Sequence, residues 1–335
     1  MRPRRSEAAL TWNGAAVTTE MIGSKGVVTY TDPAAGEADS LDVAINDRDA
    51  LWAGEWMPQK GDQLTGEIRV FDWDTEGDDR TFDCGSFILD DYGLEGWPRT
   101  GTLSAVSVPA DTSFGTTARS KTWEKATLQA IGSELAARAG ISLIWDVAGE
   151  DVPIETVEQA EQTDCEFYAS LCGEYGLFTK VYAQKLVVYD REEYKAREPS
   201  VTLRPEDLQT WSWHTTLEGS YTGGEYTYTD PLTEEEIKAT VGGGERILKK
   251  SGKADNAADA QRKIRALVAQ ANHSTTTLTV TILGRPGLVS TQCVQVEGMG
   301  AAIDGKYFID KATSQIGSGY TMDLELSKVE EVTGE

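Results

Sequence analysis

The chain has 335 residues, which is enough for two or three domains that each bury a core. With 55 acidic and 31 basic residues its formal net charge is -24, which argues against tight binding of nucleic acid. The same charge is compatible with simple solubility, or with a surface past which DNA slides without sticking. No apolar run approaches the roughly 18 residues of a membrane span, and no signal-peptide core follows the basic start Met1–Arg5, so synthesis in the cytoplasm is expected.

Residues 1–115 are predicted to form a first β module. Leu41, Val43 and Ile45 alternate with small or polar residues, and residues 67–71 alternate charged and apolar side chains. Runs of this kind recur with a turn about every ten residues, as in half-buried antiparallel strands. The pattern is typical of a β-sandwich or a β-barrel.

Residues 116–200 are predicted to form a small α+β domain inserted between two β modules. Apolar residues at helical spacing predict a helix over residues 122–139. Thr163 and Glu166 have the spacing of a capping box and open a second helix. The helices are expected to end at Gly140 and Gly176, and strands are expected near residues 141–145, 177–182 and 186–189.

Residues 201–335 are predicted to form a second β module. A helix over residues 256–272 has one apolar face and interrupts the strands of this module. The strands are expected around residues 278–283, 292–297, 307–312 and 320–326.

Three short segments of the first module recur in the second in the same order. Gly26–Pro33 is echoed by Gly224–Pro231, Ser40–Ile45 by Thr277–Ile282, and Gly85–Asp90 by Gly305–Asp310. Chance stays open as an explanation, because strands draw on few residue types and resemble one another. Repetition in a fixed order indicates instead one β module used twice. The first echo is then expected to mark where each copy starts.

No constellation of residues points to catalysis. His214 and His273 are the only histidines and lack metal-ligand spacing, so a surface or capping role is expected for each. Gly61 and Gly66 have phosphate-loop spacing, but Glu67 stands where that loop needs lysine. No serine-nucleophile elbow occurs, and carboxylate pairs are too common among 55 acidic residues to indicate a glycosidase. The sequence therefore predicts neither an enzyme nor a cofactor site.

One acidic segment approximates the first half of a calcium-binding loop. Asp72, Asp74, Glu76 and Asp78 place carboxylates at alternate positions, and Asp83 falls at the twelfth position, where such a loop has glutamate. The flanks differ from those of a calcium loop, because strands rather than helices are expected on both sides. A solvated hairpin tip is the alternative interpretation.

A further set of short motifs follows in order along nearly the whole chain. They are Asp47-Arg48-Asp49 with Trp52, Trp56 and Pro58-x-x-Gly61; Arg119 to Trp123 with Ala126-Thr127-Leu128 and Ile131; Gln162-Thr163-Asp164 with Phe167, Leu171 and Tyr175-Gly176; and Gly284-x-Pro286-Gly287, Gly305-x-Tyr307 and Gly319-Tyr320. Each motif is loose, so the specificity lies in their order and spacing. In that order and spacing the chain resembles the phage late-control D family of tail baseplate hub proteins, which is related to the N-terminal hub region of VgrG-type spikes.

The resemblance implies an α+β, mostly β fold: two tube-type antiparallel β-barrel modules with a small α+β inserted domain. It also implies a structural, non-enzymatic hub that acts as a homotrimer. Three chains present six similar barrels, which suits an adaptor between a sixfold tail tube and a threefold central spike. The expected partners are the tail tube protein, a separate central spike protein and other baseplate proteins, with DNA passing through unbound. The expected location is the virion tail baseplate, assembled in the host bacterial cytoplasm, with no membrane anchor.

Two other functions stay open on the residues alone. The carboxylates and tryptophans suit a tail-associated cell-wall hydrolase, and the acidic run suits a glycan- or calcium-binding β module. VgrG-type chains continue into a small barrel and a β-helical spike, whereas this sequence stops at Glu335, which is why a separate spike is expected. The sequence does not distinguish a contractile phage from a tail-like bacteriocin or an injection system.

Overall fold

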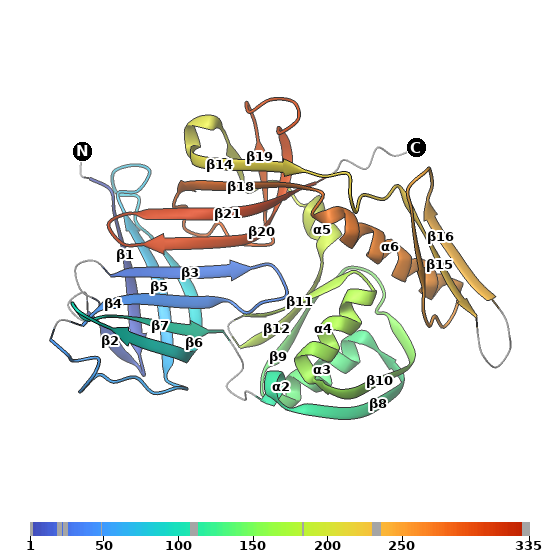
Figure 1. The fold of residues 1–335 in the computed structure, drawn as a ribbon, viewed down its shortest axis with the longest axis horizontal. Helices are drawn as coiled ribbons and strands as arrows, with labels where there is room; N and C mark the ends of the chain where they lie inside the picture. Colours follow the sequence, from blue (N-terminus) through green and yellow to red (C-terminus); the bar gives the residue numbers. More distant parts are fainter. Residues whose placement is uncertain are drawn as a thin grey trace.

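The computed structural model describes residues 3–18, 22, 26–47, 49–107, 113–182, 184–229 and 236–329 (Figure 1). Its strands are β1 (Arg5–Trp12), β2 (Ala15–Val17), β3 (Val27–Pro33), β4 (Ser40–Asn46), β5 (Gln63–Phe71), β6 (Arg80–Glu95), β7 (Thr100–Val106), β8 (Ala118–Thr127), β9 (Ser142–Asp146), β10 (Pro153–Thr163), β11 (Leu177–Tyr182), β12 (Lys185–Asp190), β13 (Val201–Leu203), β14 (Leu208–Thr215), β15 (Gly223–Thr229), β16 (Glu236–Gly242), β17 (Ile247–Ser251), β18 (Thr276–Leu283), β19 (Cys293–Val296), β20 (Gly305–Ile316) and β21 (Tyr320–Lys328). Its helices are α2 (Ser113–Thr116), α3 (Leu128–Arg138), α4 (Asp164–Glu174), α5 (Arg191–Ala196), α6 (Ala257–His273) and the 3-10 turn η1 (Pro205–Asp207).

One sheet of thirteen strands runs through both β modules (Figure 1). Its order is β14-β18-β21-β20-β3-β4-β7-β6-β5-β1-β2, with β19 on β20 and β13 on β19. The α+β, mostly β class is confirmed. Within the described residues the strands form this continuous sheet rather than two closed barrels, because β3 pairs with residues 311–316 of β20. That stretch of β20 extends beyond β19, which pairs only with residues 305–308, and so leaves an edge that β3 fills.

The two β modules share one large apolar core. Leu41 and Phe87 of the first module belong to the same buried cluster as Leu278 and Tyr320 of the second. The alternation of apolar and polar residues along β4 and β18 sends every second side chain into this cluster, as a pleated strand requires. The two modules therefore pack against each other through this core, instead of forming separate domains joined by a linker.

The second sequence echo is a true structural repeat. Strand β4 lies between β3 and β7, and its counterpart β18 lies between β14 and β21. Leu41 of β4 faces Ala105 of β7, just as Leu278 of β18 faces Leu326 of β21. The echo therefore joins strands with the same neighbours in the same register.

The third echo is repeated down to an irregularity of the backbone. β6 and β20 each carry a β-bulge at an aspartate, Asp90 and Asp310, on the side that pairs with β7 or β21. Leu89 bonds residues 61 and 62 through its carbonyl (2.9 Å) and N–H (2.8 Å), and Ile309 bonds residues 291 and 292 with the same two distances. Bulges are specific features of a fold rather than random defects, so the module is used twice, as predicted.

The prediction that the first echo marks the start of the second copy is wrong. Gly26–Pro33 covers β3 in the middle of the main sheet, whereas residues 224–229 lie in β15 of a separate three-stranded sheet. Asp230 and Pro231 lie outside the described residues. The counterpart of β3 is β14, because it pairs with β18 as β3 pairs with β4. A short strand of Thr and Tyr before a turn recurs readily, which explains the coincidence.

The inserted α+β unit has its own core and mostly follows the predicted elements. The capping box of α4 is confirmed: Thr163 Oγ1 accepts from the Glu166 N–H at 3.2 Å, and Glu166 bonds back to the Thr163 N–H at 3.3 Å. The first helix was expected from residue 122, but it begins at Leu128 after its cap Thr127. Residues 118–127 instead form β8, because they pair with β10. Gly140 and Gly176 both have the positive φ of a C′ glycine, as expected.

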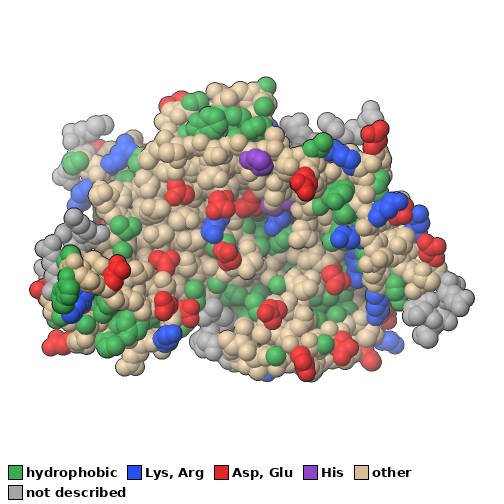
Figure 2. Space-filling model, in the orientation of Figure 1, with side chains coloured by type: hydrophobic (Ala, Val, Ile, Leu, Met, Phe, Trp, Pro, Cys, Tyr) green, Lys and Arg blue, Asp and Glu red, His purple; other side chains and the backbone are tan. Residues whose placement is uncertain are grey.

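A small outlying unit interrupts the second module between β14 and β18. Strands β15, β16 and β17 form its sheet, and α6 packs on that sheet (Figure 1). The helix predicted over residues 256–272 is confirmed as α6, with Asn256 as its N-cap. Lys249, Lys250 and Lys253 belong to this unit, and Lys and Arg side chains gather on its side of the molecule (Figure 2). No helix in the described ranges is long and apolar enough to cross a membrane.

Candidate functional site

The acidic run forms an internally bonded turn rather than an open set of ligands. Asp72 Oδ1 accepts from the Gly77 N–H at 2.8 Å. Asp74 and Asp78 both bind the Arg80 guanidinium, at 2.6 Å and 3.0 Å. Asp83 lies on β6, where it accepts from the Gly85 N–H. No group of three or more His, Cys, Asp or Glu side chains in the described part of the chain is arranged to hold a metal ion. Calcium binding by Asp72, Asp74, Glu76, Asp78 and Asp83 stays a prediction for titration to decide.

Trp73, within this acidic run, joins the two modules. Its ring is buried against Tyr320 with centroids 5.7 Å apart, and its Nε1 donates to the Gly284 carbonyl at 2.8 Å. Gly284 has to be glycine here, since a Cβ on it would lie 2.2 Å from the Tyr320 ring. The motif residues Gly284 and Tyr320 therefore form the receptor for a tryptophan from the other module. The lone aromatic residue among aspartates was the available signal for this contact.

One of the two histidines lies where it was expected, at the surface, and the other does not. His214 is exposed on β14, as expected for a surface residue. His273 is buried, not at the surface, and its Nε2 lies 2.6 Å from Oδ1 of Asp310, the bulge residue of β20. Burial lowers the pKa of His273, and Asp310 opposes that effect. The pair anchors the last turn of α6 to the main sheet.

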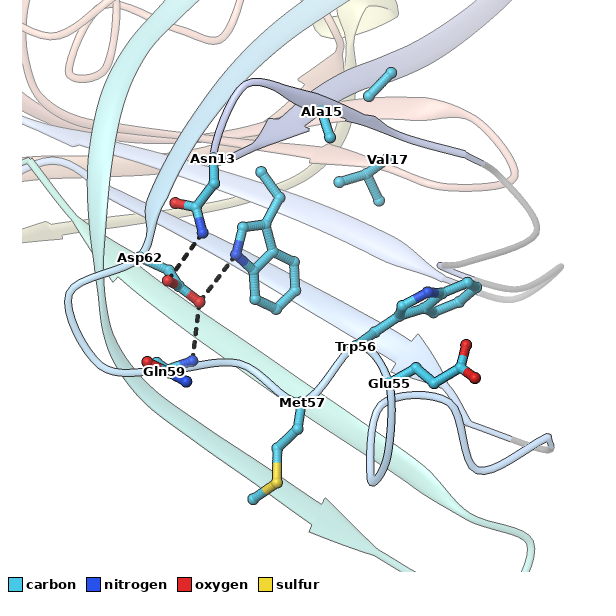
Figure 3. Close-up of a pocket in the computed structure, with 10 residues that line it drawn as sticks. Asn13, Ala15, Val17, Glu55, Trp56, Met57, Gln59 and Asp62 are labelled. Carbon is cyan, nitrogen blue, oxygen red and sulfur yellow. Dashed lines mark hydrogen bonds between the residues drawn. The ribbon is translucent and has the colours of Figure 1, made fainter.

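The motif of the first module frames a groove of about 490 Å³ (Figure 3). Trp56 and Met57 line one side, and β2 lines the other. Asp62 accepts hydrogen bonds at 2.9 Å from Trp12 Nε1, Asn13 Nδ2 and the Gln59 N–H. Burial by itself would raise the pKa of Asp62, but these bonds outweigh it and lower that pKa. The carboxylate therefore holds the groove together and is poorly suited to general acid chemistry.

A buried ionic cluster lies where the two modules meet the inserted unit. Lys180 of β11 forms ion pairs with Asp32 and with Asp39, the latter at 3.0 Å. Asp32 Oδ2 also accepts from the Ser290 N–H at 2.7 Å, and Asp39 Oδ2 accepts from the Tyr30 hydroxyl at 3.0 Å. The cluster borders a cavity of about 290 Å³. One cation thus serves two buried carboxylates, and it links segments that are 148 residues apart.

We expect Asp39→Asn to change how stability depends on pH. Burial raises the pKa of Asp39 to about 6; Lys180 opposes the shift, and Asp32 adds to it. Between about pH 4 and pH 6 the folded chain therefore keeps a proton on Asp39 that the unfolded chain has released. The contribution of this carboxyl to the free energy of unfolding is fully present below about pH 4 and is lost as the pH rises through 6. The free energy of unfolding of Asp39→Asn relative to wild type should rise by up to about 3 kcal/mol between pH 4 and 7.

Urea unfolding at several pH values measures this difference. Asp62→Asn is the matched control with the opposite sign, because a lowered pKa stabilises at neutral pH and is lost on acidification. Parallel pH profiles for wild type and Asp39→Asn would refute the assignment.

Besides the terminal strand β2, and β13, which pairs only with β19, two strand edges of the main sheet are open within the described residues. β14 is the last strand of its end of the sheet, and Trp211 on it is 54% exposed. Residues 91–95 of β6 pair with β7 on one side, while β5 stops at Ile88 on the other. Open edges present unpaired N–H and C=O groups and readily accept another strand.

Known proteins resemble this chain over most of its length. A model of the YQBQ-like family matches residues 246–327. The "Probable baseplate hub protein" of Escherichia phage 186 is 23% identical to this chain in an alignment 365 residues long. The alignment spans 95% of this chain and 91% of that protein.

Solved structures of tail proteins share the fold. The prophage MuSo2 43 kDa tail protein from Shewanella oneidensis has a TM-score of 0.73 at 16% identity, covering 97% of this chain and 98% of that chain. The tail protein from Neisseria meningitidis MC58 has a TM-score of 0.72 at 16% identity, covering 96% of each chain. A type VI secretion system component of E. coli has a TM-score of 0.55 at 11% identity, covering 97% of this chain and 78% of that one. As the order of its motifs predicted, the chain resembles the phage baseplate hub family over nearly its whole length.

Proposed function

We propose that this chain is a structural baseplate hub protein of a phage or phage-like contractile tail. The observation that carries the proposal is the register-matched duplication, in which β4, β6 and β7 recur as β18, β20 and β21 with the same bulge. The name of the phage 186 relative, at 95% coverage of this chain, supports the same assignment. We interpret residues 1–115, 116–200 and 201–335 as first module, inserted domain and second module.

In this proposal three chains form a ring that joins a sixfold tail tube to a threefold central spike. Two equivalent modules per chain give the ring six similar units, which matches sixfold packing on one side and threefold packing on the other. The partners are the tail tube protein, a separate central spike protein and other baseplate proteins. The ring is assembled in the host bacterial cytoplasm and ends in the virion tail. The alternatives, a cell-wall hydrolase or a glycan- or calcium-binding module, are favoured by no arrangement of the described residues.

The ring predicts a homotrimer in solution. Light scattering across a concentration series should give the mass of three chains, about 109 kDa from the 36.4 kDa chain, and electron microscopy should show rings. A mass of one chain up to the highest concentration reached would sink the trimer. The net charge of -24 further predicts no measurable affinity for duplex DNA at physiological salt, so that DNA passes through unbound. Saturable duplex binding would contradict a non-sticking channel.

A further inference from the structure

Within the chain, the two modules join by the addition of one strand to an open edge. β3 lies antiparallel to residues 311–316 of β20, with Tyr30 opposite Ser314 and Thr31 opposite Thr313. Val28 and Tyr30 are buried in this junction, at 4% and 3% exposure. The junction therefore shows what a completed edge of this module looks like.

The second module has a strand in the place of β3. Strand β14 pairs with β18 as β3 pairs with β4, and Trp213 faces Leu278 just as Tyr30 faces Leu41. Counting along the strands, Trp211 takes the place of Val28. Yet Trp211 is 54% exposed, because no described strand covers the outer edge of β14.

In the first module, the edge of β6 at residues 91–95 is the equivalent of the edge of β20 that β3 covers. Leu94 lies four residues after the Asp90 bulge of β6, and Ser314 lies four residues after the Asp310 bulge of β20. Ser314 is paired and buried, whereas Leu94 is only half-buried and its edge is open. Tyr92 and Leu94, like Trp213, are apolar residues packed at the margin of the core.

We infer that β14 of one chain adds to residues 91–95 of β6 in the next chain, as β3 adds to β20 within each chain. This interface rests on the ring proposed above and names the surface that closes it. The internal junction fixes the register: Trp213 lies opposite Leu94, His214 opposite Gly93 and Ser212 opposite Glu95 of the neighbouring copy. The occupant of each edge is thus a second copy of this chain.

The arrangement closes on itself. Each chain offers one strand and one receiving edge, so the contact is head-to-tail and a ring leaves neither kind of edge exposed. In the sheet order β18, β21, β20, β3, β4 and β7 lie between β14 and β6, so the strand and the receiving edge of one chain are kept apart (Figure 1). Junctions within and between chains then alternate around the ring with the same strand geometry.

Paired cysteines test the register. A chain carrying Gly93→Cys and His214→Cys should form disulfides between chains on mild oxidation, with loss of most of the monomer band in a non-reducing gel. Both sites are exposed, and a Cβ on Gly93 meets nothing within 4 Å. The matched control pairs Gly93→Cys with Thr210→Cys, four residues along β14 and so about 13 Å out of register, which is too far for a disulfide.

An edge substitution tests the contact itself. Trp211→Lys should raise the concentration at which rings half-assemble by about tenfold or more, since charge on an edge strand opposes pairing. Met57→Lys is the control, because Met57 is equally exposed (55%) but belongs to neither of the two strands that would pair, β6 and β14. Far-UV circular dichroism checks that both variants fold.

The outcomes separate the interface from the function. Rings that persist in Trp211→Lys, or that cross-link in neither register, overturn the strand pairing and leave the hub proposal standing. A wild-type chain that never assembles overturns the ring and the interface together. Cross-linking of the in-register pair alone, with loss of rings in Trp211→Lys but not in Met57→Lys, supports the inference.

Discussion

Replacing Lys180 with methionine is expected to lower the free energy of unfolding by about 3–5 kcal/mol, the usual cost of removing one partner from a buried ion pair. Asp32 and Asp39 are at most 3% exposed and would both lose their cation. The remaining hydrogen bonds from Ser290 and Tyr30 do not supply a compensating charge. Denaturant unfolding followed by circular dichroism measures the loss.

Two variants make this result specific to the cluster. Lys185→Met removes an exposed lysine from the adjacent strand β12 and should change stability by no more than about 0.5 kcal/mol. Adding Asp32→Asn and Asp39→Asn to Lys180→Met should restore part of the loss, because no buried charge is then unpaired. If Lys180→Met were as mild as Lys185→Met, the cluster would not be what holds the three units together.

Trp73→Ala is expected to cost about 3–5 kcal/mol, the range for removing a large buried aromatic side chain. The substitution removes the ring that packs against Tyr320, and the Gly284 carbonyl loses the hydrogen bond that it accepts from Trp73 Nε1. Because the contact crosses between modules, the loss should also separate their unfolding, so that one denaturation transition becomes two. Tryptophan fluorescence and calorimetry on the same samples would report this directly.

Trp73→Phe is the matched variant. It keeps a ring against Tyr320 and loses only the Nε1 bond and part of the volume, so an intermediate loss of stability is expected. Equal losses in the two variants would mean that the hydrogen bond, rather than the ring contact, accounts for the effect. A loss below about 1 kcal/mol in Trp73→Ala would contradict the role assigned to this residue.

Elements whose signal is local were predictable from the sequence. The alternation of Leu41, Val43 and Ile45 gave β4, and the Thr163–Glu166 spacing gave the start of α4, because strand pleat and helix capping act over a few residues. β10 was missed, since residues 153–163 carry three glutamates and show little apolar alternation. Residues 122–127 were taken into a helix, because only pairing with β10 makes them a strand.

Long-range contacts had no comparable signal. Lys180 reads as a lone charge in an apolar strand, and nothing in its neighbourhood points to Asp32 or Asp39 far earlier in the chain. The duplication could be read from two short echoes, but its boundaries could not. The strand that begins the second copy, β14, shares little sequence with β3, and an unrelated strand, β15, shares more. Position in the sheet is set by partners, which a pattern along one strand does not reveal.

The outlying unit has a consequence for how such chains diversify. In the first module β3 and β4 are joined by residues 34–39, whereas in the second the equivalent strands β14 and β18 are joined by residues 216–275, which fold around a core of their own. The connection between these two strands can thus be a short turn or a folded unit, and the two strands pair with each other in the same way in both cases. A folded unit can therefore be placed at this connection while the strand pairing of the main sheet stays the same.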